Sequence, residues 1–245
     1  MTMKKKLTVA LLTTLLAAAC TTEPQKGEAA AGIPDRLPGD STVYGLACDG
    51  CTDTLLIILT DINADPDTFN ILEASSRRQI FGRPQIGDEM ALVRNAADSM
   101  TADMAINLKR LKDTWCYMEQ PKLRERAGVT DEMRRQMESR MPDSVMQRIM
   151  APREFGLQFR SNHSVHTIGL QGVNAEKNSP VTYAVPHRYN EWHLMNGRLL
   201  LSEVRRDSVG NRTVLHTDTV DLTLMRRDSL VLRFKDKEQG YYRKK

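Results

Sequence analysis

The most constraining feature of this chain is a series of short alternating segments that runs from Phe155 to the C-terminus. Apolar and polar residues alternate within these segments, which is the period of half-buried strands. Turn signals separate them; Asn196-Gly197, for example, is typical of a two-residue hairpin, because a type I′ turn needs positive φ at both positions. Seven or eight short strands joined by tight turns predict a closed or nearly closed antiparallel barrel, which leaves few exposed sheet edges. The segments are Phe155–Phe159, Ser164–Leu170, Val181–Val185, Tyr189–Leu194, Arg198–Val204, Thr213–Leu215 leading into Val220–Leu224, Ser229–Phe234 and Tyr241-Tyr242.

A helical region precedes this meander, from about residue 126 to residue 150. Met133, Met137 and Met141 stand four residues apart and therefore share one face of a helix. Pro142 ends the first helix, and a second short helix follows it. Such a stripe is more often core packing, but methionine side chains also adapt to irregular apolar shapes. If the barrel holds a ligand, we expect this helical insert to be its lid.

The segment that leads into the barrel carries Asp113-Thr114-Trp115. The tryptophan lies on the first expected strand, a helical insert follows it, and the meander ends in Asp-Ser-Leu-Val-Leu. Over about residues 108–245, these features resemble the lipocalin-like domains of bacterial lipoproteins. Lipocalins carry Gly-x-Trp on this strand, and Asp113 stands here in the place of the glycine. The resemblance implies that an arginine of the last strand crosses Trp115, with Arg233 as the candidate. It also implies a barrel that can enclose a small apolar ligand.

The N-terminal half predicts a smaller β unit over residues 41–97. Strand-like runs at Thr42–Ala47 and Thr52–Thr60 are followed by a short helix within Thr68–Arg78 and by two further strands. Four or five strands with one helix fit a small OB-like barrel. Residues 98–107 are expected to form a linker or short helix. The predicted fold is therefore mainly β, with an OB-like unit followed by a lipocalin-like meander barrel.

The sharpest local motif is Cys48-Asp49-Gly50-Cys51. If Asp49-Gly50 forms a two-residue hairpin, the flanking cysteines are about 5.5 Å apart at Cα, a distance that a disulfide can bridge. We expect a structural disulfide, with free thiols, redox chemistry or metal handling as alternatives. Cys116 is then the odd cysteine, expected to be buried beside Trp115.

The chain begins like an export signal. Lys4–Lys6 precede an apolar run, Leu7–Leu16, that is too short to span a bilayer, which takes about 20 residues. Ala17-Ala18-Ala19-Cys20 resembles the lipobox of bacterial lipoproteins, which implies a signal peptide over residues 1–19 and lipid attachment at Cys20. Thr21 in the next position resembles outer-membrane sorting. An ordinary secretory leader is the alternative. Residues 20–40 are polar and small enough to form a flexible tether.

Charge and motifs exclude several function classes. Without the three leader lysines, 35 − 3 = 32 basic residues face 31 acidic ones, so no electrostatic footprint for nucleic acid remains. The sequence lacks Gly-x-Ser-x-Gly, His-Glu-x-x-His and P-loop motifs. His163 and His166 lie in expected β structure, where a spacing of three places them on opposite faces. We therefore expect no enzyme, no cofactor and no metal.

Together these features predict a non-enzymatic lipoprotein, anchored by lipid in the bacterial outer membrane. Its expected role is binding or accessory, with a small apolar ligand or an envelope protein as partner. Thiol redox or metal handling by Cys48 and Cys51 is one alternative. A purely structural or assembly role is another.

Overall fold

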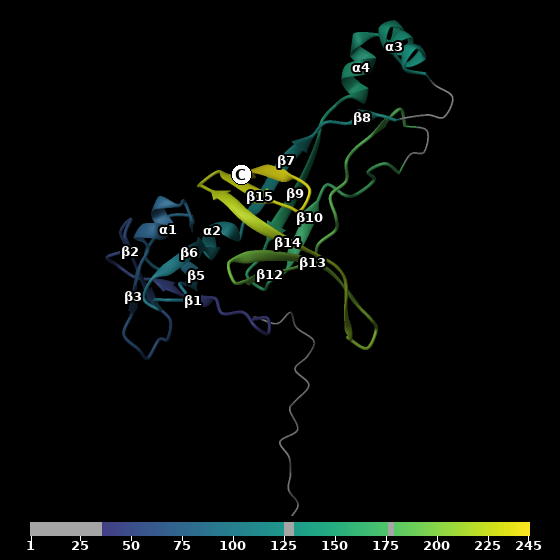
Figure 1. Ribbon diagram of the computed structural model, residues 1–245. Coiled ribbons are helices and arrows are strands. Elements are labelled where there is room, and N and C mark those ends of the chain that lie inside the picture. The colour runs from purple at the N-terminus through teal and green to yellow at the C-terminus, as the bar shows by residue number, and fades with distance from the viewer. Residues whose placement is uncertain (1–35, 125–129, 176–178) are drawn as a thin grey trace, which may run out of the picture. The chain divides into compact units, whose positions relative to one another are not determined.

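The computed structural model describes residues 36–124, 130–175 and 179–245, which lie within one compact unit. The fold of these residues is mainly β, as the alternating pattern predicts, and it contains two barrel-like sheets (Figure 1). Its helices are short, and none of those described is both long and apolar enough to cross a membrane.

Eight antiparallel strands follow one another as an up-and-down meander and form the C-terminal barrel. The last strand pairs back with the first, because Tyr242 lies opposite Cys116 and Arg243 opposite Trp115. The remaining seam lies between β10 and β12, and an isolated bridge between Ser164 and Glu191 spans it. The predicted, nearly closed antiparallel barrel is therefore confirmed. Its strands are β7 (Thr114–Glu119), β9 (Arg153–Phe159), β10 (Val165–Ile168), β12 (Glu191–Met195), β13 (Arg198–Arg206), β14 (Arg212–Met225), β15 (Ser229–Arg233) and β16 (Glu238–Arg243).

Aromatic and aliphatic side chains fill most of the barrel interior. Trp115 and Trp192 are almost completely buried, and Phe159 meets Trp192 edge-on with ring centroids 5.7 Å apart. Both indole N–H groups are satisfied: that of Trp115 donates to the Leu111 carbonyl and that of Trp192 to the Arg160 carbonyl, each at 3.0 Å. Large amphipathic rings of this kind bury apolar area while keeping their polar atoms paired. The barrel is therefore packed along most of its length.

One predicted barrel strand lies elsewhere. Val181-Thr182 forms β11, which pairs with β8 (Lys122–Leu123) in a separate two-stranded ribbon. The prediction of a barrel strand over Val181–Val185 is therefore wrong. Prolines at positions 180 and 186 flank the segment, and proline cannot donate to a strand ladder. Beyond Thr182 the chain runs without regular structure to Tyr189.

The expected helical region contains α3 (Asp131–Arg140) and α4 (Asp143–Ile149). Pro142 is the N-cap residue of α4, so it separates the two helices as predicted. None of the side chains of α4 is buried, and Met133 of α3 is 48% exposed. This pair of helices consequently adds little to the core of the described residues.

The N-terminal sheet has the strand order β3-β2-β1-β5-β6-β4. A parallel bridge between Asn70, in β3, and Thr101, directly before β6, also connects these two strands. Strands β1, β2, β3, β5 and β6 thus form a partly open five-stranded barrel of the OB type, with α1 after the third strand. The elements are β1 (Val43–Ala47), β2 (Leu55–Leu59), β3 (Asp67–Asn70), α1 (Leu72–Ser76), β4 (Ile80–Phe81), β5 (Glu89–Arg94) and β6 (Ala102–Asn107).

Strand β6 corrects the expected linker at residues 98–107. It pairs with β5 and β4, and Ala102, Ala105 and Ile106 are buried. Two of these three are alanines, whose small side chains give a weak hydrophobic pattern. The side chain of Asn107 then accepts a hydrogen bond from the Arg110 backbone N–H and caps α2 (Leu108–Leu111).

The two sheets share one core cluster. Ile106, Leu108 and Leu111 pack with barrel residues such as Trp115 and Leu230. A second cluster, which includes Leu56, belongs to the N-terminal sheet alone. The strand-to-helix segment around α2 therefore supplies apolar contacts to the barrel.

Candidate functional site

A half-open cavity of about 300 Å³ is lined by residues of β7, β9, β14 and β16, by the segment before β12 and by the β15–β16 turn. Its apolar lining comes from side chains such as Tyr117, Leu157 and Val185. His187 and Asp218 contribute polar groups, and the β15–β16 turn, Phe234–Lys237, contributes both kinds. The volume is at the lower end of the range for small-molecule sites, about 300–1,000 Å³. The cavity can therefore accommodate a small amphipathic molecule.

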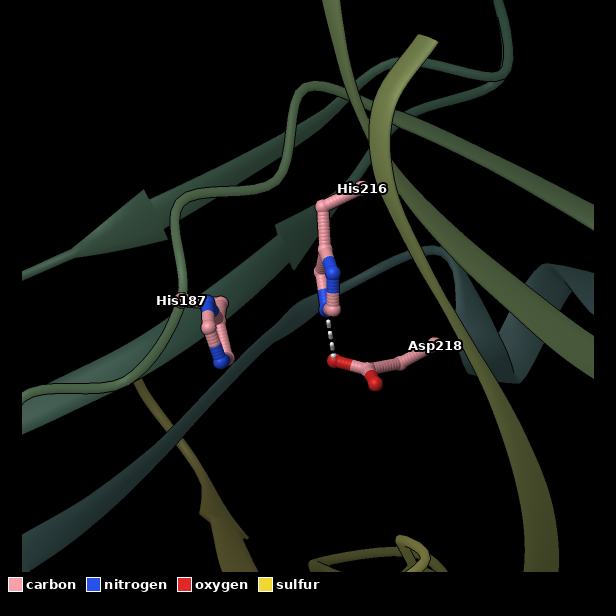
Figure 2. A group of neighbouring side chains, drawn as sticks. All are labelled: His187, His216 and Asp218. Carbon is pink, nitrogen blue, oxygen red and sulfur yellow. Dashed lines mark hydrogen bonds and ion pairs between the residues drawn. The ribbon is translucent and has the colours of Figure 1, made fainter.

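Two of these lining residues, His187 and Asp218, form a cluster with His216 (Figure 2). His216 and Asp218 stand two residues apart on β14, so the pleat directs both to one face of the strand. His187 comes from the irregular segment before β12, and its ring stacks on that of His216 with centroids 4.4 Å apart. The possible ligand atoms of the three side chains all lie within 4.8 Å of one another.

Tyr189 supports the carboxylate of this cluster. Its hydroxyl donates to Oδ2 of Asp218, and Nε2 of His216 lies 3.0 Å from the same oxygen. Partial burial acts to raise the pKa of Asp218, but hydrogen bonds from Tyr189 and His216 outweigh it and hold that pKa below its usual value. Burial, followed by the bond to Asp218, raises the pKa of the Tyr189 hydroxyl. The carboxylate is thus ionised and the phenol neutral near pH 7.

The sequence pattern missed this cluster. The spacing of His216 and Asp218 in an expected strand could have identified that pair as neighbours. His187 could not be found in the same way, because 28 intervening residues separate it from His216 and only the barrel topology brings them together. Of the other histidines, His163 and His193 stack on each other near Trp192, and His166 is exposed on β10.

The arginine that crosses Trp115 is Arg243, which corrects the expectation of Arg233. Arg243 lies on β16, its guanidinium carbon is 5.5 Å from the centroid of the Trp115 ring system, and its Nη2 is 2.9 Å from Oδ2 of Asp113. Arg233 lies on β15 and pairs with Glu238 at the surface. The barrel continues for one strand beyond the Asp-Ser-Leu-Val-Leu segment, so the last strand places a different arginine opposite the tryptophan.

Cys48 and Cys51 are free thiols, so the structure does not contain the expected disulfide. Asp49-Gly50 forms a turn, but β2 begins only at Leu55, and Cys48 pairs with Ile57 through its backbone N–H at 2.8 Å. The sulfur of Cys51 accepts a hydrogen bond from the Ile57 backbone N–H at 3.3 Å and forms no bond to Cys48 Sγ. The connection is therefore longer than a two-residue hairpin, and the two cysteines are not directly opposed. Cys116 is fully buried next to Trp115, as predicted.

The methionine stripe does not line the cavity where its side chains are described. Met133 and Met141 are absent from the cavity lining, and the side chain of Met137 lies outside the described residues. The segment before Tyr189 and the β15–β16 turn contribute lining residues instead. Cys20, the expected lipid-attachment residue, also lies outside the described residues.

Comparison of the chain with protein-family models, with curated proteins and with solved structures found no match.

Proposed function

We propose that this chain is a lipid-anchored, non-enzymatic binding protein of the bacterial outer membrane. Lipidation at Cys20 follows from the resemblance of Ala17–Cys20 to a lipobox, and the outer-membrane location follows from Thr21 in the next position. The up-and-down barrel and the contact between Arg243 and Trp115 support a relationship to lipocalin-like domains. In this proposal the C-terminal barrel binds a small, mainly apolar ligand.

The cavity lined by barrel residues is the observation that carries this function. It is walled by side chains such as Tyr117, Leu157, Val185 and Tyr241, which favour an apolar body. The histidine and carboxylate groups and the lysines of the β15–β16 turn favour a polar end on the same ligand. Because the barrel interior is packed elsewhere, the ligand occupies the cavity and does not replace the core.

Val185→Trp tests this proposal. Val185 lines the cavity and is 46% exposed, so a larger side chain there fills the cavity without entering the core. We expect at least a tenfold loss of affinity for the apolar fluorescent probe anilinonaphthalene sulfonate, measured on the full-length chain. Val209→Trp is the matched control, because Val209 is 84% exposed and lies in the β13–β14 turn. Equal binding by the two variants would exclude the cavity as the ligand site.

A further inference from the structure

We propose that His187, His216 and Asp218 form a binding site for a divalent transition-metal ion of the zinc class. The site goes beyond the proposed function, because it needs no organic ligand. It combines two side chains from one strand with a third from a segment distant in the sequence, as Figure 2 shows. None of the three is part of the packed core of the barrel.

The spacing of the donor atoms fits a metal ion. Bonds of about 2.0–2.2 Å from zinc to nitrogen and oxygen place tetrahedral ligand atoms about 3.4 Å apart. The nitrogen of His216 and the oxygen of Asp218 are already 3.0 Å apart, and the three ligand atoms lie within 4.8 Å of one another. His187 is exposed, and binding the ion requires its ring nitrogen to move closer to the other two donors than the 4.8 Å limit of the group.

The chemistry of the donors selects the kind of ion. Two imidazoles and one carboxylate suit zinc, cobalt, nickel or ferrous iron, whereas calcium and magnesium prefer sets of oxygen ligands. Three protein ligands leave at least one coordination position for water. His187 and Asp218 also line the cavity, so the proposed metal site borders it.

Tyr189 is the positioning residue of this site. Its hydroxyl donates to the Asp218 carboxylate, and groups of this kind orient metal ligands from outside the coordination sphere. A surface ion pair between His216 and Asp218 accounts for their contact, but not for the third donor stacked on His216 at 4.4 Å. The convergence of three donors is what points to a metal.

The test is titration of the metal-free, full-length chain with Zn²⁺ by calorimetry. We expect one strong site per chain, weakened at least tenfold in His187→Ala and in His216→Ala, and weakened about tenfold in Tyr189→Phe. His166→Ala is the matched control, because His166 is an exposed histidine on another strand, and it should bind like the wild type. Circular dichroism of each metal-free variant checks that the fold is kept.

Co²⁺ separates this site from the cysteines. We expect visible d–d bands without a thiolate charge-transfer band, and we expect them to persist in a Cys48→Ser, Cys51→Ser double variant. Wild-type affinity in a folded His187→Ala, His216→Ala double variant would overturn the proposal. A thiolate band that disappears with the two cysteines would do the same. Val185→Trp should retain Zn²⁺, so a failed ligand cavity and a failed metal site give different results.

Discussion

Glu191 holds two arginines together at the seam of the barrel. Its side chain is only 3% exposed, and its two oxygens accept from Arg206 and Arg212 at 2.8–3.0 Å. The same residue forms the bridge to Ser164 that connects β12 to β10. Glu191 therefore contributes at two levels: its carboxylate pairs with the arginines, and its backbone takes part in the bridge at the seam.

Glu191→Gln should destabilise the protein by about 3 kcal/mol. Removing one partner of a buried ion pair leaves the other charges uncompensated, which costs far more than the net contribution of the intact pair. Here two partly buried guanidinium groups lose the charged contact that they share with Glu191. Urea unfolding of the two proteins at neutral pH measures the difference.

Glu238→Gln is the control for that substitution. Glu238 and Arg233 are about half exposed, and surface pairs of this kind contribute about 0–1 kcal/mol. A loss at Glu191 no larger than the loss at Glu238 would show that the cluster contributes no special stability.

Single residues also show how far the sequence alone can go. Trp115 could be identified as a barrel residue because strand patterning and turn signals are local. Choosing between Arg233 and Arg243 required knowing which strand pairs with β7. That pairing joins residues more than 120 positions apart in the sequence. The grouping of His187 with Asp218 depends on packing between β14 and the segment before β12, which local patterning does not reveal.

The helical pair α3–α4 is separable from the barrel. The side chains of α4 are not buried, and neither Met133 nor Met141 lines the cavity. Replacing residues 126–150 by a short glycine-serine linker should therefore change the free energy of unfolding by less than about 1 kcal/mol, because loop entropy varies only slowly with length. Binding of the fluorescent probe should be unchanged.

Loss of probe binding in that variant would instead support the prediction that the helical insert is a lid over the ligand site. A linker of the same length as the deleted segment serves as the control for loop length. The comparison separates a contribution of the helices from an effect of shortening the connection.

Secondary-structure elements were predictable where hydrophobic alternation was strong. The pattern identified the hairpin at Asn196-Gly197, whose φ angles of 51° and 80° are both positive. It missed β6, whose alanines carry little hydrophobic signal, and it placed Val181–Val185 in the wrong sheet. Local patterning identifies strands, but it does not specify the sheet to which a short strand belongs.

Tyrosine ionisation should limit the stability of the whole chain at high pH. Burial, with a smaller contribution from Glu119, raises the pKa of Tyr117 to about 12, and a hydrogen bond to Glu154 raises that of Tyr242 to about 12. The pKa values of three more tyrosines are raised, chiefly by burial: Tyr44, Tyr189 and Tyr241. The folded state therefore favours neutral phenols over a wide part of the molecule.

The sign of the pH dependence follows from these shifts. An unfolded tyrosine ionises near pH 10, whereas the folded state keeps the proton of Tyr117 and Tyr242 up to about pH 12. Their stabilising contribution is complete below pH 10 and is lost as the pH rises through 12. Urea unfolding at a series of pH values should show this fall. The ultraviolet absorbance of tyrosinate should rise late in the native protein and near pH 10 in urea.

Tyr117→Phe provides the control, since it removes one ionisable group from the barrel. Its alkaline decline in stability should be shallower than that of the wild type. A native protein whose tyrosines all ionise near pH 10 would contradict the burial described for them.

The pairing of β16 with β7 has a consequence for the order in which the chain can fold. During synthesis β7 emerges more than 100 residues before its partner, and one of its edges stays unpaired until residues 238–243 are made. All strands of the N-terminal sheet have been made once Asn107 is synthesised, so that sheet can pair its strands without the later part of the chain. Long-range pairing of this kind is slow and leaves unpaired edges open to aggregation. A nascent chain that stalls before residue 238 therefore carries an open barrel, because β16 is the strand that pairs with β7 and closes that side.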